Sequence, residues 1–419
     1  MNEAQDRHDR DAPAEPAVSV QIQALSDWII EQGLSGGDLS SLVQGLGDRL
    51  RSFGLPVQRF HVSVRTVDPR FSGIGSTWQR DQGVGVEQYP HENIGLDRWL
   101  QSPMRVMVER GRPRMRRRLV GPKAQVDFPV LEEFRDAGGT DWYARLVVFG
   151  GADRHIALDG MVVTLVADHP DGFSDHDIAI VDRLTPRLGL AINRIVLQDI
   201  AAGVLDAYVG KDAGRRILGG QVQRGAAVRL SAAILFADLR GFTRLADTVP
   251  ADELLAALND YLGALTDCIE GHSGEVLKFM GDGLLAVFSL EDRETAAVCH
   301  DALAAARDGL AKNAALNEQR ASEGAPTMAL DIALHLGTVM YGNVGSDRRL
   351  DFTVIGPAVN EASRIEALCD ALDETLLISG QFAAACDASL RSLGEHHLRG
   401  VRAPQELFTL PKTPWPKTP

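Results

Sequence analysis

An apolar stretch that ends in a carboxylate and a glycine constrains this chain more than any other feature. In RLSAAILFADLRGFTRLAD the apolar residues run directly into Asp238, and Gly241 follows where the chain turns. A carboxylate at the end of a buried strand points into a cleft, and the turn after it exposes backbone N–H groups that can bind a phosphate. The stretch therefore predicts a buried strand that leads to a polar site.

A second stretch, EVLKFMGDGLLAVFSL, predicts a β-hairpin further along the chain. Its Gly281-Asp282-Gly283 sequence is typical of a tight turn between two strands. Such turns are usually structural. Asp238 and Asp282 nevertheless both stand at strand ends, and Mg²⁺ takes one or two carboxylates from a protein together with waters and substrate phosphates. The two aspartates are therefore candidate metal ligands.

A third segment, DFTVIGPAVNEASR, predicts a strand, a break and a helix. Pro357 follows Gly356, and proline is favoured at the first helical position. Asn360 and Arg364 are four residues apart on that helix, so they face the same side. A carboxamide and a guanidinium presented together suit a ligand with a ribose and a phosphate. An ordinary surface arginine is the alternative for this segment taken alone.

The composition is that of a soluble globular protein with an acidic balance. The 419 residues include 43 Lys and Arg against 57 Asp and Glu, a net charge of −14. Nucleic-acid binders have the opposite balance, so we expect no nucleic-acid partner. The four cysteines lie far apart without CxxC spacing, which argues against a zinc site or a disulfide framework. With a charged start and no long apolar window, the sequence predicts a cytoplasmic protein without a transmembrane segment.

The first half of the chain predicts a separate α+β module. Helical periodicity begins at Ile22, strands are expected in RFHVSVRTV, WYARLVVFG and GMVVTLVAD, and a long helix follows from Asp175. Pro186 is expected to kink that helix and so to interrupt it. The order of these elements and the closing pattern GMVVTLVADHPDGFSDHDIAIVDRL resemble GAF-type sensor domains. No cysteine lies in this half, so a thioether-attached chromophore is excluded.

Two groups of side chains in this half are candidates for ligand binding. The basic run RGRPRMRRRLVGPK predicts a solvated loop or strand edge, with an anionic ligand or partner as the alternative. Its arginines are Arg110, Arg112, Arg114, Arg116, Arg117 and Arg118. The histidines have no metal-ligand spacing, so each is expected to be a surface or hydrogen-bonded residue. They are His61, His91, His155, His169 and His176.

Four motifs of the second half, in their order and at their intervals, resemble the class III nucleotidyl cyclases. They are FADLRGFT, GEVLKFMGDGLLAVF, ALHLGTVMYGNVG and DFTVIGPAVNEASR, and the match covers about residues 231–410. The resemblance implies a βαββαβ core, ferredoxin-like and related to polymerase palms. It also implies a homodimer with composite active sites, two Mg²⁺ or Mn²⁺ ions per site, and ATP as a substrate.

The resemblance also implies roles for single residues. Asp238 and Asp282 match the two metal-binding aspartates of the family. Asn360 and Arg364 match the catalytic pair that orients the ribose and stabilises the transition state. Two metals and a preorganised guanidinium agree with in-line attack of the ribose 3′-hydroxyl on the α-phosphate.

Three further residues are implied to bind the substrate. Lys278 matches the lysine that reads the adenine ring, and Thr353 stands where many members have an aspartate as its partner. This threonine resembles a subgroup of which some members respond to bicarbonate. Many members hold phosphate with a late lysine, for which Arg399 in HHLRGVRAP is the counterpart. Lys278 and Thr353 favour adenine, because a guanine reader would more naturally offer a carboxylate.

The resulting hypothesis is an adenylate cyclase that converts ATP to 3′,5′-cyclic AMP and pyrophosphate. The N-terminal domain would regulate it through an unknown small-molecule or protein effector. The alternatives are a guanylate cyclase and a catalytically silent nucleotide-binding or dimerisation module. The predicted organisation is a flexible tail (1–20), a GAF-like regulatory domain (21–198), a helical transducer linker (199–227), a catalytic domain (228–410) and a second tail (411–419).

Overall fold

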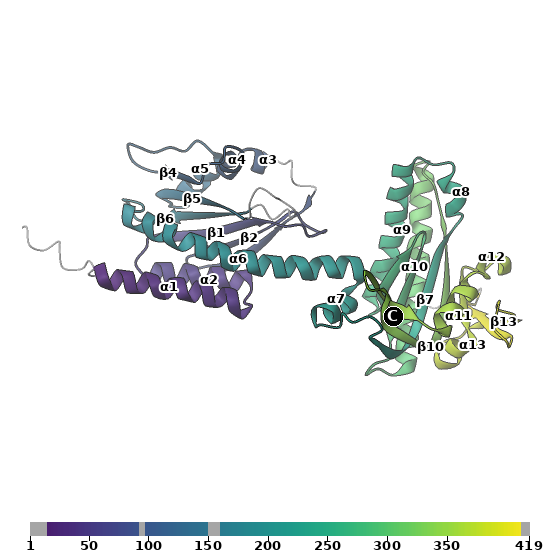
Figure 1. Cartoon of the computed structure of the whole chain (residues 1–419). Coiled ribbons are helices and arrows are strands. Elements are labelled where there is room, and N and C mark those ends of the chain that lie inside the picture. The colour runs from purple at the N-terminus through teal and green to yellow at the C-terminus, as the bar shows by residue number, and fades with distance from the viewer. Residues whose placement is uncertain (1–14, 92–96, 150–159, 412–419) are drawn as a thin grey trace, which may run out of the picture. The chain divides into compact units, whose positions relative to one another are not determined.

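The computed structural model describes residues 15–91, 97–149 and 160–411. The chain divides into two compact units, Met1–Val204 and Leu205–Pro419, each with its own sheet and core (Figure 1). The predicted tail lies outside the described residues up to residue 14, and a helix already begins at Glu15.

The first unit contains a six-stranded antiparallel sheet in the order β3-β2-β1-β6-β5-β4. Its strands are β1 (Val57–Arg65), β2 (Gly73–Gln79), β3 (Gly83–Tyr89), β4 (Arg114–Arg118), β5 (Asp141–Val148) and β6 (Gly160–Ala167). β1, β5 and β6 are the strands that the sequence predicts. β4 was predicted only as the strand-edge alternative for the basic run, and β2 and β3 were not predicted, because their glycines hide the apolar alternation that marks a half-buried strand.

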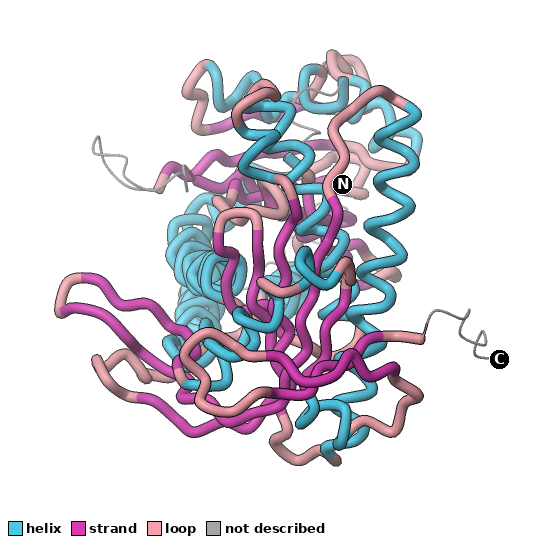
Figure 2. The backbone as a smooth tube through the Cα atoms, turned by 90° about the vertical axis from the view of Figure 1, so that its right-hand side faces the viewer, coloured by secondary structure: helices cyan, strands magenta, loops and turns pink. Residues whose placement is uncertain are grey.

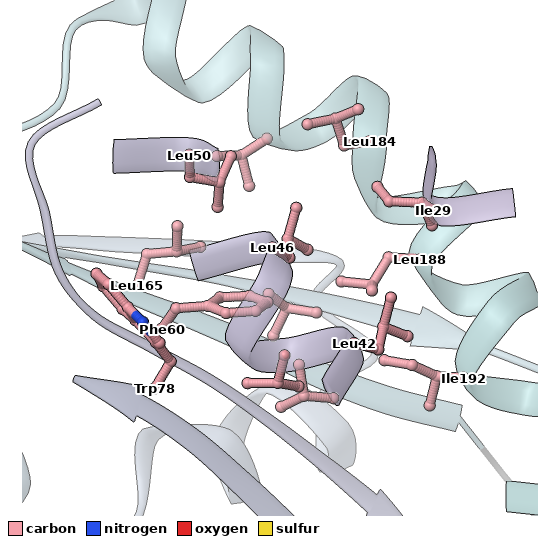
Figure 3. Packing of buried hydrophobic residues seen from close by; sticks show 14 of the residues in the cluster. Ile29, Leu42, Leu46, Leu50, Phe60, Trp78, Leu165, Leu184, Leu188 and Ile192 are labelled. Carbon is pink, nitrogen blue, oxygen red and sulfur yellow. The ribbon is translucent and has the colours of Figure 1, made fainter. Parts of the chain in front are cut away.

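Helices cover both faces of this sheet. On one face, Leu46 of α2 and Leu188 of α6 pack around Phe60 of β1 (Figure 3). On the other face, Met107 of α4 is buried with Trp142 of β5. The helices are α1 (Glu15–Ser35), α2 (Leu39–Ser52), α3 (Asp97–Leu100), α4 (Pro103–Glu109), α5 (Pro129–Asp136) and α6 (Asp175–Val209).

α6 continues as one helix through Pro186, so the expected interruption is wrong, while the kink expected at this proline stays a prediction. Proline removes one backbone hydrogen bond, but the neighbouring Thr185 and Leu188 are buried in the core, and this packing keeps the segment helical. By length and composition α6 could also cross a membrane, a test that the core helix of a globular protein passes as well. The absence of a transmembrane segment stays a prediction.

The basic run is largely neutralised inside the first unit. Arg116 donates to the fully buried Asp141 at 2.7 Å, and Arg118 lies beside the same carboxylate. Arg114 and Arg117 pair with further aspartates. Four of the six arginines therefore belong to a paired strand, β4, and this supports the strand-edge interpretation over an open anion site.

The described histidines of the first unit belong to no cluster of metal ligands. His61 is buried and shares a hydrogen bond of 2.7 Å with Thr77, and burial lowers its pKa to about 3. No group of three metal-binding side chains occurs among the described residues of the chain. His155 lies outside the described residues.

The second unit is built on an eight-stranded sheet, in which four strands follow the order β10-β7-β9-β8. All three neighbouring pairs are antiparallel, as in the βαββαβ core that the resemblance implies. The strands are β7 (Ala227–Arg240), β8 (Glu275–Met280), β9 (Gly283–Ser289), β10 (Ala329–Ser346), β11 (Arg349–Ile355), β12 (Leu376–Ser379), β13 (Arg391–His396) and β14 (Gln405–Thr409). Figure 2 follows these strands in magenta.

Helices cover both faces of this sheet as well. α9 and α10 pack on the face of β7 that includes Leu235, and α7 and α11 pack on the face that includes Ile234. Because side chains alternate along a strand, Asp238 lies on the same face as Ile234 and α11. The helices are α7 (Lys211–Leu218), α8 (Phe242–Ala246), α9 (Ala251–Gly271), α10 (Thr295–Ser322), α11 (Pro357–Glu366), α12 (Cys369–Leu372) and α13 (Gly380–Ala385).

Candidate active site

The turn between β8 and β9 brings the two predicted metal ligands together. Asp238 pairs directly with Gly283 in the β7–β9 ladder, and Asp282 precedes that glycine in the turn. A Cβ at Gly283 would lie 2.6 Å from the backbone oxygen of Ala237 and 2.8 Å from Oδ1 of Asp238, so only glycine fits this close approach. Burial and the negative charge of Asp282 raise the pKa of Asp238. The two carboxylates therefore interact at adjoining strand ends.

Two further carboxylates at this edge were not predicted. Asp331 is buried directly opposite Asp238 in the β7–β10 ladder, and Arg240 donates to both of its oxygens at 2.8 and 2.7 Å. Glu366 lies at the end of α11, and burial and the charges of the three aspartates raise its pKa to about 7. The sequence did contain a signal for Asp331. It stands in the apolar stretch LDIALHLG, and a carboxylate that is buried there requires a charged or hydrogen-bonding partner.

The donor set at this edge fits a divalent cation that binds with a nucleotide. Mg²⁺ accepts one or two protein carboxylates and fills its remaining positions with water and phosphate oxygens. Asp238 and Asp282 supply two carboxylates. The described part of the chain offers no cluster of three or more ligands that would hold a metal without such help.

A second group of residues lies on β8 and β11. Lys278 of β8 donates a hydrogen bond to the carboxylate of Asp351 on β11, and the two form an ion pair. Thr353, the expected partner of Lys278, is two residues further along β11, and no hydrogen bond between it and Lys278 occurs in the described structure. Asp351 was not predicted as a site residue, since only the folded sheet brings it near Lys278.

A third group surrounds the start of α11. Asn360 and Arg364 line an open pocket of about 800 Å³, together with Gly400 and Arg402 from the loop before β14. A Cβ at Gly400 would lie 3.6 Å from the guanidinium of Arg364, so the loop passes close to this side chain. Arg399 is exposed and does not line the pocket, whereas Arg402 does.

The wall of this pocket is held by a partly buried network. Glu361, which also lines the pocket, accepts a hydrogen bond of 2.8 Å from Gln405 of β14. Its carboxylate lies 3.7 Å from Nε2 of the buried His335 of β10. Burial lowers the pKa of His335, and the charge of Glu361 opposes that effect. Two strands therefore fix the helix that presents Asn360 and Arg364.

Within one chain the predicted site residues form three separate groups. Asp238 and Asp282 make up the first, Lys278 the second, and Arg364 with Asn360 the third. No hydrogen bond or ion pair of the described residues joins one group to another.

Residues 228–411 match the family model described as the adenylate and guanylate cyclase catalytic domain. An adenylate cyclase of Anabaena cylindrica is 35% identical over 158 residues, which cover 38% of this chain and 31% of that protein. Adenylate cyclase 1 of Rhizobium meliloti is 31% identical over 207 residues, covering 48% and 30% of the two chains. The segment 228–411 is thus a class III adenylate/guanylate cyclase catalytic domain.

The same segment resembles solved cyclase structures. The adenylyl cyclase CyaB from P. aeruginosa is 26% identical with a TM-score of 0.41, and the match covers 45% of this chain and 97% of that one. The chain spans about a third of the length of the curated relatives it matches.

Proposed function

We propose that the second unit is an adenylate cyclase, which converts ATP to 3′,5′-cyclic AMP and pyrophosphate. The observation that carries this proposal is the convergence of Asp238 and Asp282 at adjoining strand ends, inside the segment that matches the cyclase model. Class III cyclases depend on divalent metals in general. Mg²⁺ or Mn²⁺, two ions per site, would activate the ribose 3′-hydroxyl and neutralise the triphosphate.

The pocket at α11 supports a role in binding the ribose and the phosphates. Arg364 has no ion pair with any described residue, so its donors are free to meet the charge that develops on the α-phosphate. Asn360, one turn earlier, is placed to hydrogen-bond the ribose. Arg402 adds a second guanidinium to the same pocket.

Adenine is the base that Lys278 favours on this proposal, because its ammonium can donate to N1 of the ring. Two of the relatives that match this segment are named adenylate cyclases. We expect ATP to be preferred over GTP by at least about tenfold in kcat/KM, which corresponds to about 1.4 kcal/mol. A guanylate cyclase and a silent nucleotide-binding module remain the alternatives.

Composite sites in a homodimer would unite the three groups of residues. Large apolar side chains stay exposed close to the site: Phe279 is 52% exposed on β8, and Ile355 is 47% exposed at the end of β11. Such residues favour burial against a partner. In a two-fold dimer the same surface of each chain meets the other, so Asp238 and Asp282 of one protomer can face Lys278 and Arg364 of its partner.

The first unit is proposed to be a GAF-like regulatory domain of a cytoplasmic enzyme. Its six-stranded antiparallel sheet with helices on both faces supports a sensor module, and its effector is an unidentified small molecule or protein.

The proposal is tested with the purified full chain, ATP or GTP, and Mg²⁺ or Mn²⁺, with cyclic product measured by chromatography and mass spectrometry. Chelation, Asp238→Ala and Asp282→Ala should each abolish product formation. Asp267→Ala, which removes an exposed carboxylate from α9, should leave the rate unchanged. Comparable turnover in the Asp238 and Asp282 variants would contradict the metal assignment, and no product from the unmodified chain would favour the silent module.

A further inference from the structure

The ion pair between Lys278 and Asp351 is the starting point of this inference. The two residues are 73 positions apart in sequence and lie on strands β8 and β11. The Nζ atom of Lys278 donates to Oδ2 of Asp351, and the side chains are 42% and 52% exposed. The pair therefore sits at the surface of the unit, where a ligand can reach it.

Stability does not explain this pair. Exposed ion pairs contribute little to folding, because water screens the charges and two long side chains lose freedom. The pair instead restricts the flexible side chain of Lys278 to one region, next to β11.

The register of β11 places Asp351 beside the residue expected to bind the base. Asp351 and Thr353 are two positions apart, so their side chains lie on the same face of the strand. Phe352 and Val354 point to the opposite face and are buried. The carboxylate of Asp351, which holds the ammonium of Lys278, therefore shares one face of β11 with the half-buried hydroxyl of Thr353.

We infer that Asp351 is a specificity-determining positioning residue, which holds the ammonium of Lys278 for adenine. This inference rests on the proposed function. The lysine ammonium has three donors, and Asp351 occupies one of them. The others remain free for N1 of adenine, and Thr353 can accept from the 6-amino group. Asp351 thus acts on the base through Lys278.

The alternative is that Asp351 contacts the base directly. A carboxylate accepts from N1–H and the 2-amino group of guanine, which adenine does not offer in that arrangement. If Asp351 did this, its removal would lower kcat/KM for GTP more than kcat/KM for ATP. The positioning role has the opposite consequence. Without Asp351 the Lys278 side chain loses its fixed position, so kcat/KM falls more for ATP than for GTP.

Steady-state kinetics of the full chain with ATP and with GTP separates these roles. Asp351→Ala and Asp351→Asn should raise KM for ATP by about tenfold, change kcat by less than about threefold, and lower the ATP/GTP ratio of kcat/KM. Asp351→Glu should recover most of the ratio, because it keeps the carboxylate. The matched control is Asp347→Asn. Asp347 lies in the turn between β10 and β11 and pairs with Arg224 at 2.9 Å. The control should have the same KM for ATP and the same ATP/GTP ratio of kcat/KM as the unmodified chain.

A second measurement follows Lys278 without relying on turnover. Limited acetylation followed by peptide mass spectrometry reports how available each lysine is. Lys278 should react several times faster in Asp351→Ala than in the unmodified chain or in Asp347→Asn, because the ion pair no longer holds its ammonium.

Different results would contradict the positioning role of Asp351 and the proposed function. An unchanged ATP KM, an ATP/GTP ratio that rises in Asp351→Ala, or equal acetylation of Lys278 in all variants would overturn the positioning role. Absence of cyclic product from the unmodified chain would overturn the proposed function instead, and with it the purine role given to Asp351.

Discussion

Replacing Glu366 by glutamine should stabilise the second unit at pH 8 in the absence of divalent cations. Burial and the charges of Asp238, Asp331 and Asp282 raise the pKa of Glu366 from 4.5 to about 7. An acid with a raised pKa binds its proton more tightly in the folded state, so its ionisation lowers stability as pH rises from about 4.5 to about 7. Glutamine cannot ionise and avoids this cost.

The size of the effect follows from the pKa and the exposure of the group. A pKa difference of one unit corresponds to about 1.4 kcal/mol, which gives an upper limit of about 3 kcal/mol here. The side chain keeps contact with water, and screening reduces the expected gain to about 1–2 kcal/mol. For a unit of this size, that gain raises Tm by about 2–8 °C.

Calorimetry of the full chain in chelator, between pH 5 and pH 8, measures this difference. Glu366→Gln should exceed the unmodified chain in Tm at pH 8, and the advantage should shrink toward pH 5. Mg²⁺ should also shrink it, because a cation at Asp238 and Asp282 favours the ionised Glu366. Glu318→Gln, at an exposed position on α10, is the control. A Tm difference that is the same at pH 5 and pH 8 would refute the reasoning.

Three further predictions concern the site and its regulation. Mixing Asp238→Ala with Arg364→Ala chains should restore about a quarter of the activity, since random pairing makes about half the dimers mixed and each has one intact site. No recovery, with heterodimers shown by native mass spectrometry, would mean that the site lies within one chain or that the two sites cannot work independently. Arg402→Ala should raise KM for ATP more than Arg399→Ala, because Arg402 lines the pocket, and the reverse order would favour the sequence assignment. Deletion of the residues before 199 should leave a folded cyclase with a changed rate, and an unchanged rate would argue for a plain spacer.

Elements with local signals could be predicted from the sequence. The Gly-Asp-Gly turn predicted the β8–β9 hairpin, and Gly356-Pro357 predicted the start of α11. The helix through Pro186 was predicted wrongly, because the local cost of proline is smaller than the packing of α6 into its core. Local rules cannot weigh such tertiary burial.

The site residues that were missed depend on contacts between distant strands. Asp331 meets Arg240 only because β7 and β10 pair in one register, and Asp351 meets Lys278 only when β8 and β11 come close. Neither pair has a sequence spacing that marks it. Motif reading therefore finds residues that the family shares, while the charges that tune them emerge from the fold.

The β8–β9 hairpin connects the chemistry of the second unit to the segment that enters it. Lys278 and Asp282 both belong to this hairpin, so a shift of the hairpin against β7 changes the base-reading and the metal-binding groups together. Glu275, the first residue of β8, accepts a hydrogen bond of 2.7 Å from the backbone N–H of Asp212 at the start of α7. α7 follows directly on the end of α6. A displacement of α7 would therefore act on both groups through Glu275, which gives the proposed regulation a physical route inside this unit.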